Sequence, residues 1–388
     1  MIKKKKSPSY LRSLQVDTAH GRLLSPIFMP DATRAFIKGL SASDLEHSRT
    51  EALVVNTFHL YLQPGLEILK KAGGVHKFMN WSAPLLSDSG GFQVFSLVHR
   101  RQGMGKVDDN QVTFKSPLDG SWHELSPEKS IQIQFDLGVD LMVCLDDCPP
   151  NDWPRPKLEK AVERSITWAR RCKAEYLRQL KKRKLTATKK PILMAVVQGG
   201  DYEDLRYHCA QELIKIGFDA YGFGARPIDE QGNFLADTLY KTASYLPDNS
   251  LRFALGIGLP EDIYRCYLMG WDMFDCVIPT REGRHAKLFY FKAKFKGFKK
   301  IPKKMGPVDK FPDFYHSINI SQAIFKKDFS AINPNSRFPE LRNYTKAYLH
   351  HLFRLKEPFG QKLATLNNLE FYQNLILELK KINRENNK

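Results

Sequence analysis

Polar clusters that could do chemistry follow four short apolar runs of this sequence, and one more acid, Asp275, lies within a further run. The clusters are Asn56-Thr57, Ser87-Asp88-Ser89-Gly90-Gly91, Asp146-Asp147 and Gln198-Gly199-Gly200. A carboxylate can act as a nucleophile or as a general acid and base, and a glycine lets a bound molecule approach the backbone closely. Asp, Ser and Gly also close strands in ordinary turns. Four such clusters in one chain nevertheless indicate a shared site.

Eight short apolar runs recur along the chain, separated by longer stretches with helical spacing. The runs cover residues 26–29, 53–55, 84–86, 141–145, 192–197, 221–223, 253–256 and 274–278. Runs that are apolar throughout are typical of parallel strands buried on both faces, and the segment Pro156 to Leu185 is predicted to be a crossover helix. Eight strands with crossovers over roughly 250 residues favour a closed (β/α)8 TIM barrel, an α/β fold, over an open sheet. The polar clusters then lie at the carboxyl ends of the strands, where barrels keep their active sites.

The composition indicates a globular protein with a polyanionic partner. The chain has 388 residues, 42% of them apolar, and a formal net charge of +18. This charge suggests nucleic acid as the partner, with a merely soluble basic protein as the alternative. The six cysteines include no CxxC pair, which favours a reducing compartment. The first eight residues lack the apolar run of a signal peptide, and no charge-free apolar stretch of about twenty residues occurs. We therefore expect a cytoplasmic protein that does not bind membranes.

The chain changes character after Arg284, because residues 287–304 hold eight lysines and no acid. Within this segment three lysines alternate with apolar residues, in the order Phe291, Lys292, Ala293, Lys294, Phe295 and Lys296. The period of two predicts a strand with one cationic face, which could lie along a phosphate backbone. A solvated edge strand protected by lysines is the alternative.

Three regions follow from these patterns. Residues 10–285 are expected to form the barrel and to hold the catalytic site. Residues 286–343 are expected to form a small basic, aromatic-rich subdomain. Residues 344–388 are expected to form closing helices that pack on the barrel, because residues 344–379 have helical periodicity.

Four segments together resemble the tRNA-guanine transglycosylases, or queuine tRNA-ribosyltransferases. The segments are Ser87-Asp88-Ser89-Gly90-Gly91-Phe92-Gln93-Val94, Leu145-Asp146-Asp147-Cys148, Val197-Gln198-Gly199-Gly200 and Phe274-Asp275-Cys276-Val277-Ile278-Pro279-Thr280-Arg281-Glu282-Gly283-Arg284. Each is weak alone, but their order and spacing make the joint match specific. The resemblance runs from about Pro26 to the segment Tyr344-Thr345-Lys346-Ala347-Tyr348.

This resemblance implies a pentosyltransferase that exchanges guanine at anticodon position 34 of tRNA for a 7-deazaguanine in queuosine biosynthesis. Breaking the N-glycosidic bond builds positive charge on the sugar, so one carboxylate can trap C1′ covalently while a second acid protonates the departing purine. By resemblance, Asp275 is the nucleophile and Asp88 is the general acid and base. The target must be unstacked to reach the pocket, which fits a loop base.

The resemblance also implies the residues that hold the base and the tRNA. Asp146, Gln198, Gly199 and the Gly224-Ala225 loop would bind the base edge, and Phe92 would stack on its face. The alternatives are purely structural roles, with Asp146 as a helix cap and Phe92 as a core residue. The tRNA would be held by five cationic residues; for Arg281 and Arg284 a salt bridge across the barrel rim is the alternative. They are Arg281, Arg284, Lys287, Lys292 and Lys294.

One departure from the family concerns a metal. Most relatives carry Cys-x-Cys-x2-Cys and a distant His in the late segment, which bind a structural zinc. Here the cysteine positions hold Ser336, Phe338 and Leu341, and the histidine position near Leu366 holds Asn367. These side chains cannot form a tetrahedral zinc site, so we predict no zinc and expect apolar packing of Phe338 and Leu341 to offset its loss. No organic cofactor is expected, because one base replaces another without redox change.

A second departure lies in the base pocket, where relatives read Gly-Gly-Leu and this chain reads Gly224-Ala225-Arg226-Pro227. In relatives this loop accepts the cationic aminomethyl group of the incoming base. If Arg226 points inward it repels such a cation, and a differently substituted 7-deazaguanine or guanine itself would enter. If Arg226 points outward, it can meet tRNA phosphate instead.

Two other functions stay open at this point. The chain could be a tRNA-binding paralogue with weakened turnover, although retention of Asp275 argues against this, or a base-exchange enzyme that acts on DNA. The resemblance further implies a homodimer in which the second subunit helps to hold one tRNA.

Overall fold

The computed structural model describes residues 3–4, 12–100, 103–151, 153–229, 231–298 and 306–385. Two features discussed above lie partly outside these residues. They are the start of the chain and the second half of the basic segment, with Lys299, Lys300, Lys303 and Lys304.

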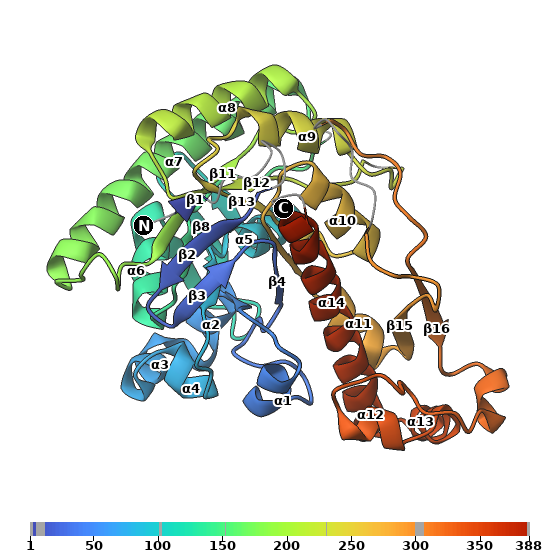
Figure 1. The fold of residues 1–388 in the computed structure, drawn as a ribbon. Helices are drawn as coiled ribbons and strands as arrows, with labels where there is room; N and C mark the ends of the chain where they lie inside the picture. The colour runs from blue at the N-terminus through green and yellow to red at the C-terminus, as the bar shows by residue number, and fades with distance from the viewer. Residues whose placement is uncertain are drawn as a thin grey trace.

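An eight-stranded sheet of parallel strands forms the centre of the molecule (Figure 1). In their order around the sheet, the strands are β4 (Ile27–Pro30), β14 (Met273–Cys276), β13 (Leu251–Ala254), β12 (Ala220–Phe223), β11 (Ile192–Val197), β10 (Leu141–Val143), β6 (Leu85–Asp88) and β5 (Leu53–Asn56). A parallel bridge between Asp31 and Val54 joins β4 to β5 and closes the sheet into a barrel. All eight predicted runs belong to this sheet, so the predicted (β/α)8 barrel is confirmed.

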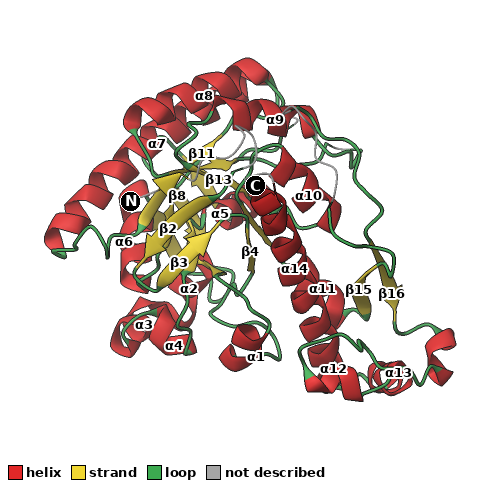
Figure 2. Cartoon of the chain, in the orientation of Figure 1, coloured by secondary structure: helices red, strands yellow, loops and turns green. Residues whose placement is uncertain are grey.

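Helices surround the strands (Figure 2), as expected for crossovers that cover a parallel sheet. In chain order they are α1 (Ala42–His47), α2 (Thr57–Leu60), the π-helix η1 (Tyr61–Gly65), α3 (Leu66–Ala72), α4 (Val75–Met79), α5 (Gly91–Arg100), α6 (Pro127–Leu137), α7 (Arg155–Lys182), α8 (Glu203–Ile216), α9 (Ala236–Tyr245), α10 (Pro260–Leu268) and α11 (Ile278–Arg284). A small sheet of β7 (Gly105–Val107), β8 (Val112–Lys115) and β9 (Trp122–Leu125) lies between α5 and α6. The helix predicted at residues 156–185 is α7, which buries Leu158, Val162 and Ile166 at helical spacing.

Alternation along the strands separates the barrel interior from its outer face. Inward-facing residues such as Ile27, Met29, Val54 and Leu86 form one apolar cluster inside the barrel. On five strands the next inward position, two residues further on, is polar, because successive side chains of a strand point to opposite faces. These five residues are Asp31, Asn56, Asp88, Gln198 and Asp275. They lie at the carboxyl ends of the strands, which we call the mouth.

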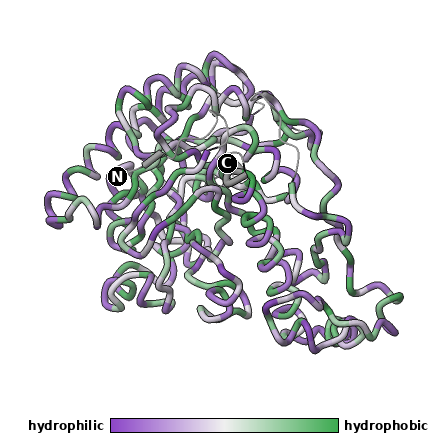
Figure 3. Tube along the Cα trace, viewed as in Figure 1, coloured by the Kyte–Doolittle hydropathy of each residue, from purple (hydrophilic) through white to green (hydrophobic). Residues whose placement is uncertain are grey.

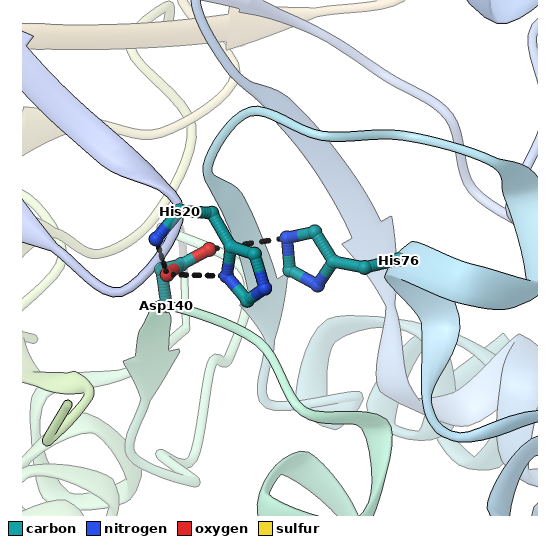
Figure 4. A group of neighbouring side chains, drawn as sticks. All are labelled: His20, His76 and Asp140. Atoms are coloured by element: carbon teal, nitrogen blue, oxygen red, sulfur yellow. Dashed lines mark hydrogen bonds and ion pairs between the residues drawn. The ribbon is translucent and has the colours of Figure 1, made fainter.

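A three-residue cluster ties the opposite end of the barrel together (Figure 4). The carboxylate of Asp140, which precedes β10, bonds to His20 Nδ1 at 2.9 Å and to His76 Nε2 at 3.2 Å, and it accepts the Leu85 N–H at 3.0 Å. His20 comes from the turn between β2 (Leu14–Thr18) and β3 (Gly21–Leu24), and His76 comes from α4. Asp140 therefore links the N-terminal hairpin, which also pairs with β1 (Lys3–Lys4), to two barrel elements.

The C-terminal region packs against the side of the barrel (Figure 1). It contains β15 (Lys287–Phe291), antiparallel to β16 (Tyr315–Asn319), then the 3-10 helix η2 (Ala323–Lys327), α12 (Pro339–Asn343), α13 (Lys346–Arg354) and α14 (Pro358–Glu385). The helical prediction for residues 344–379 is confirmed. The predicted alternating strand at 291–296 is wrong, because β15 ends at Phe291 and a turn follows in which the Phe295 N–H donates to the Lys292 carbonyl. Phe291 and Phe295 stack face to face across that turn. The two-residue spacing of apolar side chains in the sequence therefore reflects an aromatic contact across a turn and not a strand.

Hydrophobic and hydrophilic positions alternate along the outer helices (Figure 3). In the part of the chain that the structure describes, no helix is both long and apolar enough to cross a membrane.

Replacing Asp140 is predicted to weaken the fold in a pH-dependent way. Burial of Asp140 acts to raise its pKa, but the hydrogen bonds from His76, Leu85 N–H and His20 outweigh it and hold the pKa below its ordinary value. A depressed carboxyl pKa stabilises the fold above the unfolded-state pKa of about 3.9, and this stabilisation is lost as the pH falls further. Asp140→Asn should lower the free energy of unfolding by about 3 kcal/mol at pH 7, measured by urea denaturation.

The difference between Asp140→Asn and the unmodified protein should shrink below about pH 4. The control is Asp17→Asn, since the Asp17 side chain is 55% exposed and pairs with Arg22 on the surface. That change should alter stability by less than about 1 kcal/mol. An Asp140→Asn effect that is equal at pH 7 and pH 3 would contradict the assignment.

Candidate active site

A cavity of about 630 Å³ opens at the mouth of the barrel. Inward-facing apolar residues form its floor, including Val54, Leu86, Val196 and Phe253. Polar residues at the strand ends form its walls. Eight of the predicted site residues line this one cavity: Asp88, Phe92, Asp146, Gln198, Gly224, Ala225, Asp275 and Arg281.

Asp88, at the end of β6, is held by three donors. Its Oδ1 accepts the N–H groups of Thr57 at 3.1 Å and Gly90 at 3.1 Å, and its Oδ2 accepts the amide of Asn56. Burial raises the pKa of Asp88 to about 8; the Thr57 and Gly90 bonds act to lower the pKa, and the negative charges of Asp31 and Asp275 act to raise it. A carboxyl group with this pKa carries a proton near pH 7 and can donate it.

Asp275, at the end of β14, has a simpler environment. It is partly buried, and its Oδ1 accepts the Gly256 N–H at 2.7 Å. Burial raises the pKa of Asp275 to about 7; the Gly256 bond lowers it and the charge of Asp31 raises it. Asp88 and Asp275 are thus two acids in unlike surroundings, and burial raises the pKa of both. One cavity can therefore hold a protonated acid beside a carboxylate.

Asp146 and Gln198, which follow the neighbouring strands β10 and β11, form a buried pair in the cavity. The Gln198 amide donates to Asp146 Oδ2 at 2.6 Å, while Gln198 Oε1 is buried without a partner among the described residues. Burial raises the pKa of Asp146 to about 7, with the Gln198 bond lowering it and Asp147 raising it. A buried acceptor without a donor points to a bound molecule that supplies an N–H or O–H.

Glycine is required beside this pair. A Cβ on Gly224 would lie 2.5 Å from the Gln198 amide, and one on Gly199 would lie 2.6 Å from the backbone nitrogen of Arg206. Ala225 adopts φ 87°, a conformation that usually needs glycine. The backbone of Arg226 is fixed by Asn151, whose side chain bonds to its N–H and its carbonyl. The exposed Arg226 side chain lines the cavity rim.

The alternatives considered for Phe92 and Asp146 do not match their surroundings. Phe92 is 56% exposed and lines the cavity, so it is not a core residue. Asp146 bonds to Gln198, whereas the following helix, α7, has Pro154 at its N-cap.

The predicted tRNA-binding residues are not all near the cavity. Arg281 lines it and its side chain is 51% exposed, with its neighbour Glu282 as its ion-pair partner at 3.4 Å. Lys287 pairs with the same acid, and Lys292 pairs with Asp313. Arg284, Lys287, Lys292 and Lys294, like the predicted base-binding Gly199, do not line the cavity.

The sequence analysis did not identify Arg206, whose side chain bonds to the backbone of the loops beside the cavity. Arg206 lies on α8, is 1% exposed, and donates to the carbonyls of Gly200, Val197 and Gly224. Its guanidinium also lies over the Phe223 ring. Burial lowers the pKa of Arg206 to about 10, so the group stays cationic. An arginine on an amphipathic helix usually faces solvent, so the sequence does not indicate that this side chain is buried against backbone carbonyls.

One group of described residues, His20, His76 and Asp140, brings three metal-ligand atoms within 4.8 Å of one another. The two imidazole rings, however, are stacked with their centroids 3.6 Å apart and their planes 15° apart (Figure 4). Lone pairs of nearly parallel rings cannot converge on one tetrahedral ion. The group also lies at the opposite end of the barrel from the cavity, so we interpret it as a structural hydrogen-bond cluster.

The late segment places other residues where the family resemblance implies zinc ligands. Phe338 and Leu341 are buried in an apolar cluster with Leu349 and Leu366. Ser336 donates to Glu370, and the Asn367 amide donates to the Phe289 carbonyl at 3.1 Å. This set offers no thiolate or imidazole and does not fit a zinc ion.

Comparison with known proteins identifies the family of this chain. A family model described as queuine tRNA-ribosyltransferase matches residues 9–387. Three relatives carry the same name: one from Thermoanaerobacter pseudethanolicus is 37% identical, covering 98% of this chain and 92% of the relative. One from Halothermothrix orenii is 36% identical, covering 94% and 88%, and one from Staphylococcus aureus strain JH9 is 36% identical, covering 95% and 88%. The chain therefore belongs to the queuine tRNA-ribosyltransferase family.

Proposed function

We propose that this chain is a tRNA-guanine transglycosylase that exchanges guanine at anticodon position 34 for a 7-deazaguanine through a covalent bond between Asp275 and ribose. The observation that carries the proposal is the cavity that Asp88 and Asp275 share with the buried Asp146–Gln198 pair. Membership of the family supports tRNA as the substrate.

The reaction would proceed in two displacements. A carboxylate oxygen of Asp275 bonds to C1′ while the bond from C1′ to guanine breaks, and Asp88 gives its proton to the departing base. After guanine leaves, the incoming base attacks C1′, the bond to Asp275 breaks, and Asp88 takes the proton of the incoming base. Burial raises the pKa of Asp88 to about 8, so this acid can carry the proton that the departing base receives, while Asp275 accepts one backbone N–H and stays open to the cavity as a nucleophile must.

Recognition of the base would use the buried acceptors of the Asp146–Gln198 pair. Guanine and 7-deazaguanine present N–H donors on one edge, and Gln198 Oε1 and Asp146 are buried acceptors in the cavity. The exposed ring of Phe92 is available to stack on the purine face. Arg281 at the rim, with Arg284, Lys287, Lys292 and Lys294, would hold the tRNA strand. A homodimer around one tRNA stays an expectation from the family.

Trapping the intermediate tests the nucleophile and the activity together. The protein is mixed with an anticodon stem-loop without an incoming base and run on a denaturing gel, where a shifted protein–RNA band is expected. Asp275→Ala should abolish the band and lower kcat by at least about 1000-fold, because the covalent step has no substitute. Asp237→Ala, which removes an exposed acid on α9, is the matched control and should keep the band.

Absence of a band and of guanine exchange in the unmodified protein would contradict the proposal and favour a paralogue that only binds tRNA. A band that persists in Asp275→Ala would reject Asp275 as the nucleophile.

We also propose that the incoming base is guanine or a 7-deazaguanine without the aminomethyl cation. Arg226 lines the cavity rim, and its side chain has no hydrogen bond or ion pair among the described residues, so its positive charge can face the entering base. Two like unit charges about 4 Å apart repel by about 1 kcal/mol even in water.

Arg226→Ala is expected to raise kcat/KM for the aminomethyl compound about fivefold or more relative to guanine, because it removes this repulsion. Incorporation of radiolabelled bases into tRNA measures the ratio. Arg226→Lys keeps the charge and should keep the discrimination. Efficient use of the aminomethyl compound by the unmodified protein would overturn this part of the proposal.

We further propose that the C-terminal region folds without a metal. The apolar contacts of Phe338 and Leu341 and the bonds of Ser336 and Asn367 support this. Treatment with a strong zinc chelator should leave the Tm unchanged, whereas Leu341→Ala should lower the free energy of unfolding by about 2–5 kcal/mol. One equivalent of tightly bound zinc, with a fall in Tm on chelation, would contradict the proposal.

A further inference from the structure

Asp31 is an acid of the cavity that the proposed reaction leaves without a role. It follows Ile27 and Met29 at two-residue spacing, so it faces the barrel interior, and it lines the cavity. In the register of β4 and β14, Asp275 lies opposite Met29. Asp31 is therefore about two residues, or roughly 7 Å along the strand, nearer to the opening than Asp275.

One oxygen of Asp31 is fixed and the other is free to bind. Oδ1 accepts both the N–H and the hydroxyl of Thr33, each at 2.7 Å. Oδ2 has no hydrogen bond or ion pair with any residue that the structure describes. Thr33 thus orients the carboxylate, and its second oxygen is left as an acceptor at the cavity wall.

The strand order shows which part of a bound nucleotide Asp31 would meet. β4 is the neighbour of β14 on one side, while β13, β12 and β11 lead away on the other side toward Gln198 and Asp146. A nucleoside with its base at Gln198 and its C1′ at Asp275 therefore extends its sugar, and the next nucleotide, toward β4. Asp31 faces sugar and backbone rather than base.

An internal nucleotide of RNA has one hydrogen-bond donor on its sugar, the 2′-hydroxyl, because O3′ and O5′ are esterified. A carboxylate repels the phosphates but accepts from this hydroxyl, and the hydroxyl is what distinguishes RNA from DNA. We propose that Asp31 accepts a hydrogen bond from the 2′-hydroxyl of the exchanged nucleotide or of its neighbour and thereby selects RNA over DNA. This inference rests on the proposed base-exchange function.

The test compares substrates rather than absolute rates. The charge of Asp31 lies close enough to Asp88 and Asp275 to act on both acids, so replacing it will change every rate to some extent. The ratio of kcat/KM between two substrates on the same variant cancels that general effect.

The substrates are an all-ribose anticodon stem-loop and versions with a single 2′-deoxy sugar at the exchanged guanosine or at either neighbour, with radiolabelled guanine as the incoming base. The unmodified protein should lose about tenfold or more in kcat/KM at one of these positions, as expected for a hydrogen bond to a charged acceptor. Asp31→Ala should use the deoxy and ribose versions equally, within about twofold. Asp31→Asn keeps an acceptor oxygen and should show intermediate discrimination.

Asp17→Asn, which removes an exposed carboxylate from the hairpin at the other end of the barrel, is the matched control and should discriminate like the unmodified protein. If Asp31→Ala does not fold, Thr33→Val, which frees the oriented carboxylate, should still reduce the discrimination. Discrimination that is absent in the unmodified protein, or unchanged in the Asp31 and Thr33 variants, overturns the inference while exchange on the all-ribose stem-loop upholds the proposed function. Absence of exchange on that stem-loop overturns both.

Discussion

The alternation of side chains along eight parallel strands is the constraint on which the site depends. Inward positions are apolar along the depth of the barrel, as with Met29 and Leu86, and they become polar only at the last inward position before the loops. The carboxylates therefore lie next to packed apolar side chains of the barrel interior, which exclude water from that side. Desolvation is the first cause of the raised pKa of Asp88, Asp146 and Asp275 alike. The barrel thus determines both where the acids lie and that their pKa values are raised.

Neighbouring groups then distinguish one acid from another. Asp88 accepts two backbone N–H groups and an amide, whereas Asp275 accepts one N–H and stays open to the cavity. Asp146 accepts the Gln198 amide on one carboxylate oxygen. Buried Arg206 donates to carbonyls of the two loops beside this pair, so the shape of the cavity there depends on a residue that does not line it.

The barrel could be predicted because its strands are apolar throughout and recur along the chain. Asp88, Asp146 and Gln198 could be chosen because each follows such a run, whereas Asp275 lies within one and was identified by the family resemblance. Asp31 could have been predicted to line the cavity in the same way, since it continues the spacing of Ile27 and Met29. No adjacent glycine or second acid, however, distinguishes it in the sequence. Arg206 was out of reach, because its partners are carbonyls that a sequence does not reveal. The error at 291–296 arose because aromatic residues four apart, such as Phe291 and Phe295, can stack across a turn as well as alternate along a strand. Whether Lys292 and Lys294 contact tRNA depends on a complex that periodicity cannot describe.

The pairing of β4 with β14 has a consequence for how the molecule is made. The strand nearest the start of the barrel sequence, Ile27–Pro30, pairs with the last barrel strand, Met273–Cys276, and α14 covers it from outside through Gln373, which donates to the Phe28 carbonyl. During synthesis on the ribosome, about 250 residues must therefore be added after β4 before its partner β14 emerges. Until then the nascent sheet has an apolar edge whose backbone groups are unpaired and open to association with other chains. Pairing with β14 satisfies this edge, and α14 then covers β4 from outside, so the first barrel strand is fully protected only after the C-terminal helix has formed.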